Sequence, residues 1–250
     1  PLLPRQPSAQ NRALRPPIGA FSTRVGAMAK LHRVAPWLAL ALLVLLGGDS
    51  ALASMERLLG VRGYADLTAQ ALLAIMAARN AAELCLALFG VYAILRAPLT
   101  SIGLRLPKVG ELALGVAVGL AAALIFPWLI HELRLQGSYH LQYDLYIMSR
   151  ATGLTAAASI LLYLIFVPIV EEIVFRGIVL QGLLNATNGV VAVVVSALIF
   201  AGVHAVGGFG QVTTAFMTGV VFGWLYLRTR SIVPSSVAHV IYDTAALYPF

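Results

Sequence analysis

Long apolar runs constrain the fold of this chain more than any other feature of its sequence. Seven runs of helical length alternate with short polar connections. They lie near residues 35–54, 67–95, 111–130, 154–175, 189–206, 211–227 and 232–248. A hydrocarbon core about 30 Å thick requires around 20 apolar residues per helix. Charged residues make up 11% of the chain, whereas a soluble domain contains about 25%. The sequence therefore predicts an all-α, polytopic transmembrane helix bundle with about seven spans.

Basic residues predict the orientation of this bundle. Six of the 17 Lys and Arg residues precede the first apolar run, as is typical of a cytoplasmic flank. The connections that contain Arg105 and Arg230 are basic as well, whereas the connection that contains Glu132 and Arg134 carries both signs. We expect these two groups of connections at opposite ends of the bundle. We also expect the amino terminus in the cytoplasm and the protein in the plasma (inner) membrane of a bacterium.

The first apolar run leaves two alternatives open. It combines "MAKLHR", "APWLALALLVLLGG" and Ala51-Leu52-Ala53, which are the basic, apolar and small-residue parts of a secretory signal peptide. The same run can instead anchor the chain, whereas cleavage would leave six spans. The preceding residues 1–34 are basic and have loop composition, so we expect them to be disordered. Met28 within them is an alternative start of translation.

Two adjacent glutamates and an arginine interrupt the fourth run, in "VPIVEEIVFRG". A charge at the centre of a bilayer costs about 2.5–3.5 kcal/mol on insertion scales, so these residues need a partner or a function. Glu172 and Arg176 are four residues apart and can pair on a helix. Glu171 then has no predicted partner. Pro168 is expected to kink or open the helix just before them. The alternative is an interfacial charge cluster that reaches the headgroups.

Two histidines lie in later apolar runs. His204 belongs to "FAGVH" in the fifth run, and His239 precedes Asp243 by four residues in the seventh. A carboxylate at this spacing can orient an imidazole and fix its tautomer. The pair His140 and Asp144 has the same spacing, but it falls in a polar loop that we expect at the membrane interface. For His204 alone, a hydrogen-bonded packing role is the alternative.

Together these polar residues have the parts of a peptide hydrolase. Intramembrane ionisable residues usually face each other or a water-filled cavity, so we expect the fifth and seventh runs to converge on the fourth. A glutamate in such a cavity can act as a general base, and a histidine can hold the same water. A second histidine can stabilise the oxyanion that forms when water attacks a carbonyl. The same residue types are also the ligands of catalytic zinc, although the sequence contains no HExxH.

Two pairs of glycines have the spacing of helix-packing motifs. Gly115 and Gly119 form a GxxxG in the third run, and Gly219 and Gly223 form another in the sixth. Small residues at this spacing let helix backbones approach closely. We expect them to serve packing, either within one chain or between chains, so the oligomeric state stays open.

Three motifs resemble those of one known family. "EEIVFRG" resembles the EExxxR signature of the CAAX-protease and bacteriocin-processing (CPBP) family of intramembrane proteases, which includes type II CAAX prenyl endopeptidases. "FAGVH" is similar to the FxxxH of that family, and "HVIYD" to its third motif, in which asparagine usually follows histidine by four residues. The resemblance covers about residues 150–245. It implies a catalytic core over residues 150–250. The earlier apolar runs and the polar loop between them predict N-terminal transmembrane spans with an interfacial loop over residues 35–149.

The resemblance also implies a role for each motif residue. Glu171 would activate water together with His204, and His239 would stabilise the oxyanion. Glu172 would pair with Arg176 in a supporting role.

Asp243 departs from the family pattern because it replaces the usual asparagine. An ionised aspartate cannot donate a hydrogen bond to an oxyanion, so Asp243 would orient His239 or carry a proton. A divalent metal such as zinc, held by Glu171, His204 and His239, is an alternative to activation of water without a metal.

The resemblance implies an intramembrane endopeptidase that hydrolyses membrane-associated peptides, either prenylated or bacteriocin-like. The expected partners are the lipid bilayer and a peptide or protein substrate, and no nucleic acid is expected. Two other functions stay open, namely a non-catalytic membrane protein in bacteriocin immunity or complex assembly and a proton-coupled transporter. Buried Glu and His side chains also form proton relays, but the chain has no inverted repeat of broken helices.

Overall fold

Helices and their connections make up the part of the chain that the structure describes. This computed structural model describes residues 18–62, 67–135 and 151–246. In chain order the elements are α1 (Ile18–Leu59), α2 (Ala69–Ala93), η3 (Leu99–Ile102), α3 (Val109–Glu132), α5 (Gly153–Leu161), η4 (Leu162–Phe166), α6 (Val167–Glu172), η5 (Ile173–Leu180), α7 (Gln181–Leu184), α8 (Gly189–Val203), η6 (Ala205–Gly207), α9 (Gly208–Thr229) and α10 (Ile232–Ala246). The predicted all-α membrane bundle is confirmed.

The helices differ in length more than the sequence predicts. Among the described residues, five helices are long and apolar enough to cross a membrane. They are Met28–Leu59, Ala69–Ala93, Val109–Glu132, Gly153–Leu184 and Ala205–Thr229. The other two, α8 and α10, contain 15 residues each. At 1.5 Å per residue they cover about 22 Å, which is less than the hydrocarbon core. The bundle therefore combines five long spans with two shorter helices.

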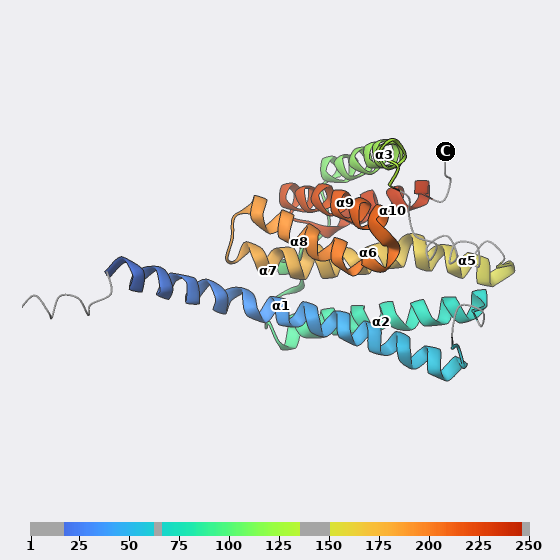
Figure 1. Cartoon of the computed structure of the whole chain (residues 1–250), viewed down its shortest axis with the longest axis horizontal. Coiled ribbons are helices and arrows are strands. Elements are labelled where there is room, and N and C mark those ends of the chain that lie inside the picture. Colours follow the sequence, from blue (N-terminus) through green and yellow to red (C-terminus); the bar gives the residue numbers. More distant parts are fainter. Residues whose placement is uncertain (1–17, 63–66, 136–150, 247–250) are drawn as a thin grey trace, which may run out of the picture.

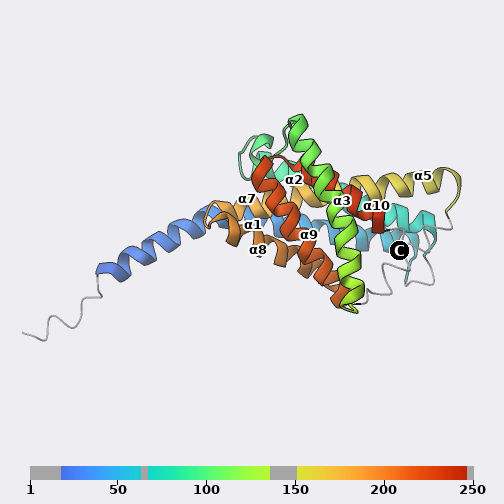
Figure 2. The same ribbon diagram turned by 90° about the horizontal axis from the view of Figure 1, so that it is seen from above.

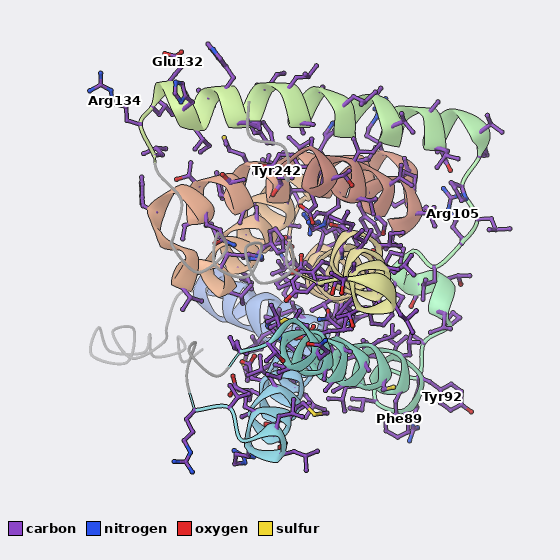
Figure 3. The ribbon with its side chains drawn as sticks, turned by 90° about the vertical axis from the view of Figure 1, so that its right-hand side faces the viewer. Phe89, Tyr92, Arg105, Glu132, Arg134 and Tyr242 are labelled. Carbon is purple, nitrogen blue, oxygen red and sulfur yellow. The ribbon has the colours of Figure 1, made fainter. Side chains whose placement is uncertain are left out.

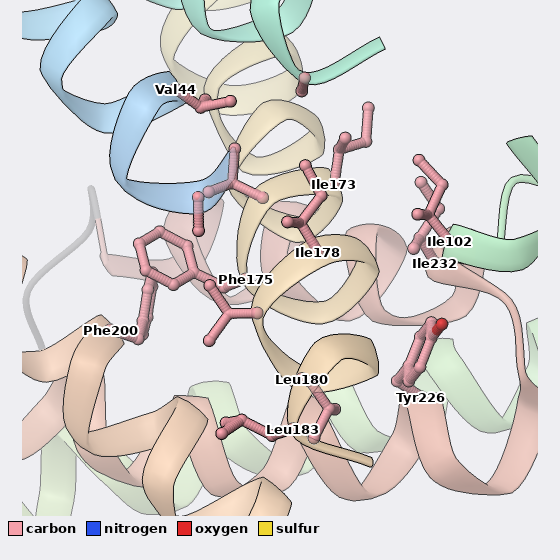
Figure 4. Close-up of a cluster of buried hydrophobic side chains, with 14 of the residues drawn as sticks. Val44, Ile102, Ile173, Phe175, Ile178, Leu180, Leu183, Phe200, Tyr226 and Ile232 are labelled. Atoms are coloured by element: carbon pink, nitrogen blue, oxygen red, sulfur yellow. The ribbon is translucent and has the colours of Figure 1, made fainter. Parts of the chain in front are cut away.

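The segment Gly153–Leu184, which we call the central helix, runs through the middle of the bundle (Figure 1). It consists of α5, η4, α6, η5 and α7 in succession. On one side of it α1 packs against α2, and on the other side α3 packs against α10 (Figures 1 and 2). α8 and α9 form a third pair. Val170, Ile173 and Ile178 of the central helix are at most 3% exposed, and the largest hydrophobic core surrounds them (Figure 4).

Pro168 does not end the central helix. The helix widens into π-helical turns at Leu162–Phe166, just before the proline, and again at Ile173–Leu180. Because proline has no N–H to donate, the opening expected at this position takes the form of a wider turn and the helix continues. π-helical turns inside helices occur frequently at functional sites, and here they flank the two glutamates.

α1 is longer than the first apolar run. It begins at Ile18, so residues 18–34 are helical, although loop composition led us to expect disorder; residues 1–17 lie outside the described ranges. Arg, Lys, Met and Ala are good helix formers, so the helix that starts in the apolar run extends beyond it and projects from the bundle (Figure 1). Leu40 and Val44 of α1 are 1% and 0% exposed. The first apolar run therefore contributes to the core, while its cleavage or retention stays a prediction.

The connections lie at the ends that the charge pattern predicts. Arg105 Nε donates a hydrogen bond to the carbonyl oxygen of Arg230 at 3.2 Å, so these two basic connections share one end of the bundle. Figure 3 shows Arg105 near one end of α3 and Glu132 and Arg134 at its other end. The relative placement is confirmed, and the cytoplasmic location of the basic end stays a prediction.

Both predicted glycine pairs pack helices within the chain. A Cβ at Gly115 would lie 2.5 Å from the carbonyl oxygen of Pro234, and one at Gly119 would lie 2.8 Å from Cα of Ala238. Real Cβ atoms do not approach other atoms so closely, so glycine is required where α3 crosses α10. Gly219 meets Ala197 of α8 in the same way, at 2.9 Å. The glycines thus hold α10 and α9 in place, and α10 carries His239 and Asp243.

Candidate active site

Glu172 and Arg176 form a buried ion pair in the central helix. Arg176 Nη1 lies 3.0 Å from Glu172 Oε1, and the two side chains are 1% and 0% exposed. This is the pair that their spacing predicts. The guanidinium also lies over the rings of Phe200 and Phe222, with its carbon 4.8 Å and 5.6 Å from the ring centroids. The carboxylate and two aromatic faces together stabilise a charge that the apolar surroundings alone would disfavour.

His239 on α10 is oriented by Glu172. Its Nδ1 lies 3.0 Å from Glu172 Oε1, and because a carboxylate oxygen accepts, Nδ1 is the donor. This bond directs Nε2 toward Glu171 Oε2 at 3.7 Å and toward Asp243 Oδ2 at 3.6 Å. Both of those distances are too long for a hydrogen bond. The hydrogen bond that orients His239 therefore comes from the central helix, and the role of Asp243 stays a prediction.

His204 stands at the carboxyl end of α8, where the helix has just ended, and not within it as its apolar context led us to expect. Its Nδ1 lies 2.8 Å from the carbonyl oxygen of Phe200. A carbonyl only accepts, so Nδ1 carries a proton and Nε2 of the neutral ring is an acceptor. Nε2 lies 3.8 Å from Glu171 Oε1. Glu171 thus has one imidazole beside each of its oxygens.

Phe200 connects these groups, although the sequence marks it only as the first letter of "FAGVH". Its ring centroid lies 4.5 Å from that of His204 and 6.1 Å from that of His239, edge to face in both cases. Its ring centroid also lies 4.8 Å from that of Phe175, and Figure 4 shows the two side chains next to each other. Because its carbonyl oxygen also accepts from His204, Phe200 holds that imidazole through both its backbone and its ring.

Glu171 and His204 line a cavity of about 520 Å³ between α1, α2, the central helix and the segment after α8. Arg79, Asn80 and Glu83 of α2 line it as well. Sequence reasoning missed these three residues because it treated the run 67–95 only as a span. The signal was present: Arg79 and Glu83 are four residues apart in an apolar run, as Glu172 and Arg176 are.

A metal site is not evident in the part of the chain that the structure describes. No group of three or more His, Cys, Asp or Glu side chains there is arranged to hold a metal ion. Metal binding by Glu171, His204 and His239 stays a prediction. The second His–Asp pair, His140 and Asp144, lies outside the described residues.

A comparison with protein families gives a match to the carboxyl-terminal part of the chain. Residues 153–245 match the family model described as type II CAAX prenyl endopeptidase, Rce1-like. This segment begins with the central helix and ends one residue before the end of α10, so it contains every motif residue discussed above. No curated protein and no solved structure gives a significant match to the chain.

Proposed function

Residues 153–245 belong to the Rce1-like, type II CAAX prenyl endopeptidase family, and on this premise we propose that the chain is an intramembrane endopeptidase in which Glu171 and His204 activate water. The family supports protease activity in general, and the apolar helices indicate an integral membrane protein. The residue roles and the nature of the substrate are our proposal. We propose that the substrate is a peptide associated with the membrane.

One observation carries the proposal, namely the position of Glu171 between two imidazoles. The distances from its oxygens to Nε2 of His204 and of His239 are 3.8 Å and 3.7 Å. Polar atoms at such separations are commonly bridged by water. Glu171 is 21% exposed and lines the cavity, so a water molecule and a substrate carbonyl can reach it from the same side.

In the proposed first step, Glu171 removes one proton from this water while Nε2 of His204 accepts a hydrogen bond from the O–H that remains. His204 can accept because its Nδ1 is committed as a donor to Phe200. The water oxygen then bonds to the carbonyl carbon of the peptide. The carbonyl oxygen becomes an oxyanion, which needs a donor nearby.

In the proposed second step, Nε2 of a protonated His239 donates to the oxyanion. The bond from its Nδ1 to Glu172 keeps Nε2 directed at the reacting groups. As the oxyanion collapses, the C–N bond breaks and Glu171 passes its proton to the leaving nitrogen. The immediate products are a carboxylic acid and an amine, and Glu171 returns to its ionised form; the proton of the acid then passes to the amine, which gives a carboxylate and an ammonium group.

Asp243→Asn is expected to raise kcat about fivefold. Asp243 Oδ2 lies 3.6 Å from His239 Nε2, where an asparagine amide would add a neutral donor beside the oxyanion. A hydrogen bond of this kind contributes about 1 kcal/mol, which is about fivefold in rate. Steady-state cleavage by both forms in detergent measures the effect. A large loss of activity would instead mean that the negative charge of Asp243 is required.

The direct test is cleavage of a fluorogenic library of membrane peptides by the purified protein. We expect wild type to cleave and Glu171→Ala to be inactive while eluting as the same folded species. A chelator is added in parallel: loss of activity that zinc restores would assign a metal, and insensitivity would favour activation of water by Glu171 and His204. If the wild type cleaves no peptide, a non-catalytic role in immunity or complex assembly becomes the better account.

A further inference from the structure

Arg79 places a cation in the wall of the cavity that contains Glu171. It lies on α2, within a span of mean hydropathy 1.7, and lines the same cavity as Glu171 and His204. A charged residue within a span usually faces a cavity or a partner and marks the path of a substrate or ion. The mechanism proposed above makes no use of this residue.

Most of the hydrogen-bonding capacity of Arg79 is unused. A guanidinium has five N–H donors in a planar fork. Arg79 Nε donates to Glu83 Oε1 at 3.1 Å. Its Nη2 lies 3.5 Å from Asp49 Oδ1, a looser ion pair. Within the described ranges, no protein atom accepts a hydrogen bond from Nη1 or Nη2, and the side chain is 33% exposed.

Glu83 holds the guanidinium in a fixed orientation. It is 5% exposed and packs against α1 where Gly48 leaves room, because a Cβ at Gly48 would lie 2.4 Å from Glu83 Oε1. A side chain enclosed in this way cannot easily turn away from Arg79. The Nε edge of the fork is therefore fixed by a buried carboxylate, and the Nη edge is left for another acceptor.

Asp49 is a poor candidate for the permanent partner of that edge. Its side chain is 65% exposed, and exposed ion pairs contribute little to stability. A carboxylate of a bound molecule could replace it at Nη1 and Nη2 while Asp49 returns to water. A bidentate arginine–carboxylate pair is shorter and stronger than a single ion contact.

We propose that Arg79 binds a carboxylate group of the peptide substrate and thereby determines which peptide bond reaches Glu171. This inference rests on the proposed peptidase function and adds a specificity residue from outside the segment 153–245. The carboxylate could belong to the carboxyl terminus of the peptide or to an acidic side chain. Both have the same chemistry, and the experiment distinguishes them.

The test uses the peptide that the wild type cleaves fastest, prepared in three forms: with a free carboxyl terminus, with a terminal carboxamide, and with a terminal carboxamide plus a glutamate one residue earlier. We expect kcat/KM to be about tenfold to hundredfold higher with a carboxylate than without one, the range for a charged hydrogen bond. Recovery of cleavage by the third form would assign the side chain, and no recovery would assign the carboxyl terminus.

Three variants separate recognition from a structural role. Arg79→Gln should abolish the preference, and Arg79→Lys should retain only part of it, because lysine keeps the charge and loses the fork. Asp49→Asn is the matched control. It removes the ion pair between Asp49 and Arg79 but keeps the guanidinium, so the preference should stay intact. If Arg79 only holds α1 and α2 together, Arg79→Gln would instead lower the cleavage of all three peptides by the same factor.

Equal cleavage of the acid and the amide by wild type, or a preference that survives in Arg79→Gln, would overturn the inference. If the wild type cleaves no peptide, the peptidase function fails and the inference is tested by binding alone. The affinity of the wild type for a leucine-rich peptide is then measured by thermophoresis in its acid and amide forms. Equal affinities would contradict it, and tighter binding of the acid that Arg79→Gln removes would support it.

Discussion

Glu171→Gln is expected to lower kcat for peptide cleavage by about 10²–10⁴-fold, the usual contribution of a general base. Glutamine has nearly the same shape, but its amide cannot accept a proton from water at neutral pH. The side chain of Glu171 is 21% exposed and lines the cavity, so the variant should fold like the wild type. Steady-state cleavage in nanodiscs measures kcat and KM separately, and we expect KM to change little.

Combining His204→Gln with Glu171→Gln tests whether His204 and Glu171 act on the same water molecule. If they do, their effects do not add, because either substitution alone already removes the activated water. The double variant should then be within about threefold of the slower single variant. A double variant whose loss equals the product of the two single losses would mean that the residues serve different steps. Glu132→Gln, the same change at an exposed position at the end of α3, is the control and should cleave like the wild type.

Contacts within one helix could be predicted from the sequence, because helix geometry fixes them. The pair of Glu172 and Arg176 follows from their spacing, and in the structure their charged groups lie 3.0 Å apart. The convergence of His204 and His239 on Glu171 was also expected, from the cost of isolated polar groups in a membrane. The glycine pairs predicted that α3 and α9 pack closely against other helices, but they did not predict which helices those are.

Contacts between helices could not be predicted from one sequence. The bond from His239 to Glu172 depends on how α10 crosses the central helix, which in turn depends on Gly115 and Gly119 of α3. Periodicity carries no information on such crossings. The early end of α8 could have been predicted, because two glycines, Gly207 and Gly208, follow His204 in the sequence. In the structure Gly208 has a φ of 77°, a conformation that glycine adopts readily.

Arg176→Met is expected to destabilise the folded protein by about 3–5 kcal/mol, because it leaves the carboxylate of Glu172 buried without its cation. Glu172 is 0% exposed, so water cannot take the place of Arg176. His239 stays as one partner, and the loss should therefore fall within this range and not exceed it. The free energy of unfolding, measured by titration from detergent into SDS, tests the effect. An unchanged free energy would mean that Glu172 is neutral in the folded wild type.

Two double variants then separate charge balance from the orientation of His239. Glu172→Leu combined with Arg176→Met removes both charges, and replacing a buried pair by apolar side chains is often neutral or stabilising, so stability should return. Activity should not return, because His239 Nδ1 has lost the oxygen to which it donates. Glu172→Gln combined with Arg176→Met keeps an acceptor oxygen and should recover part of the activity as well. Equal activity in both double variants would show that Glu172 balances a charge without positioning His239, and the proposed oxyanion step would then need another group to orient that imidazole.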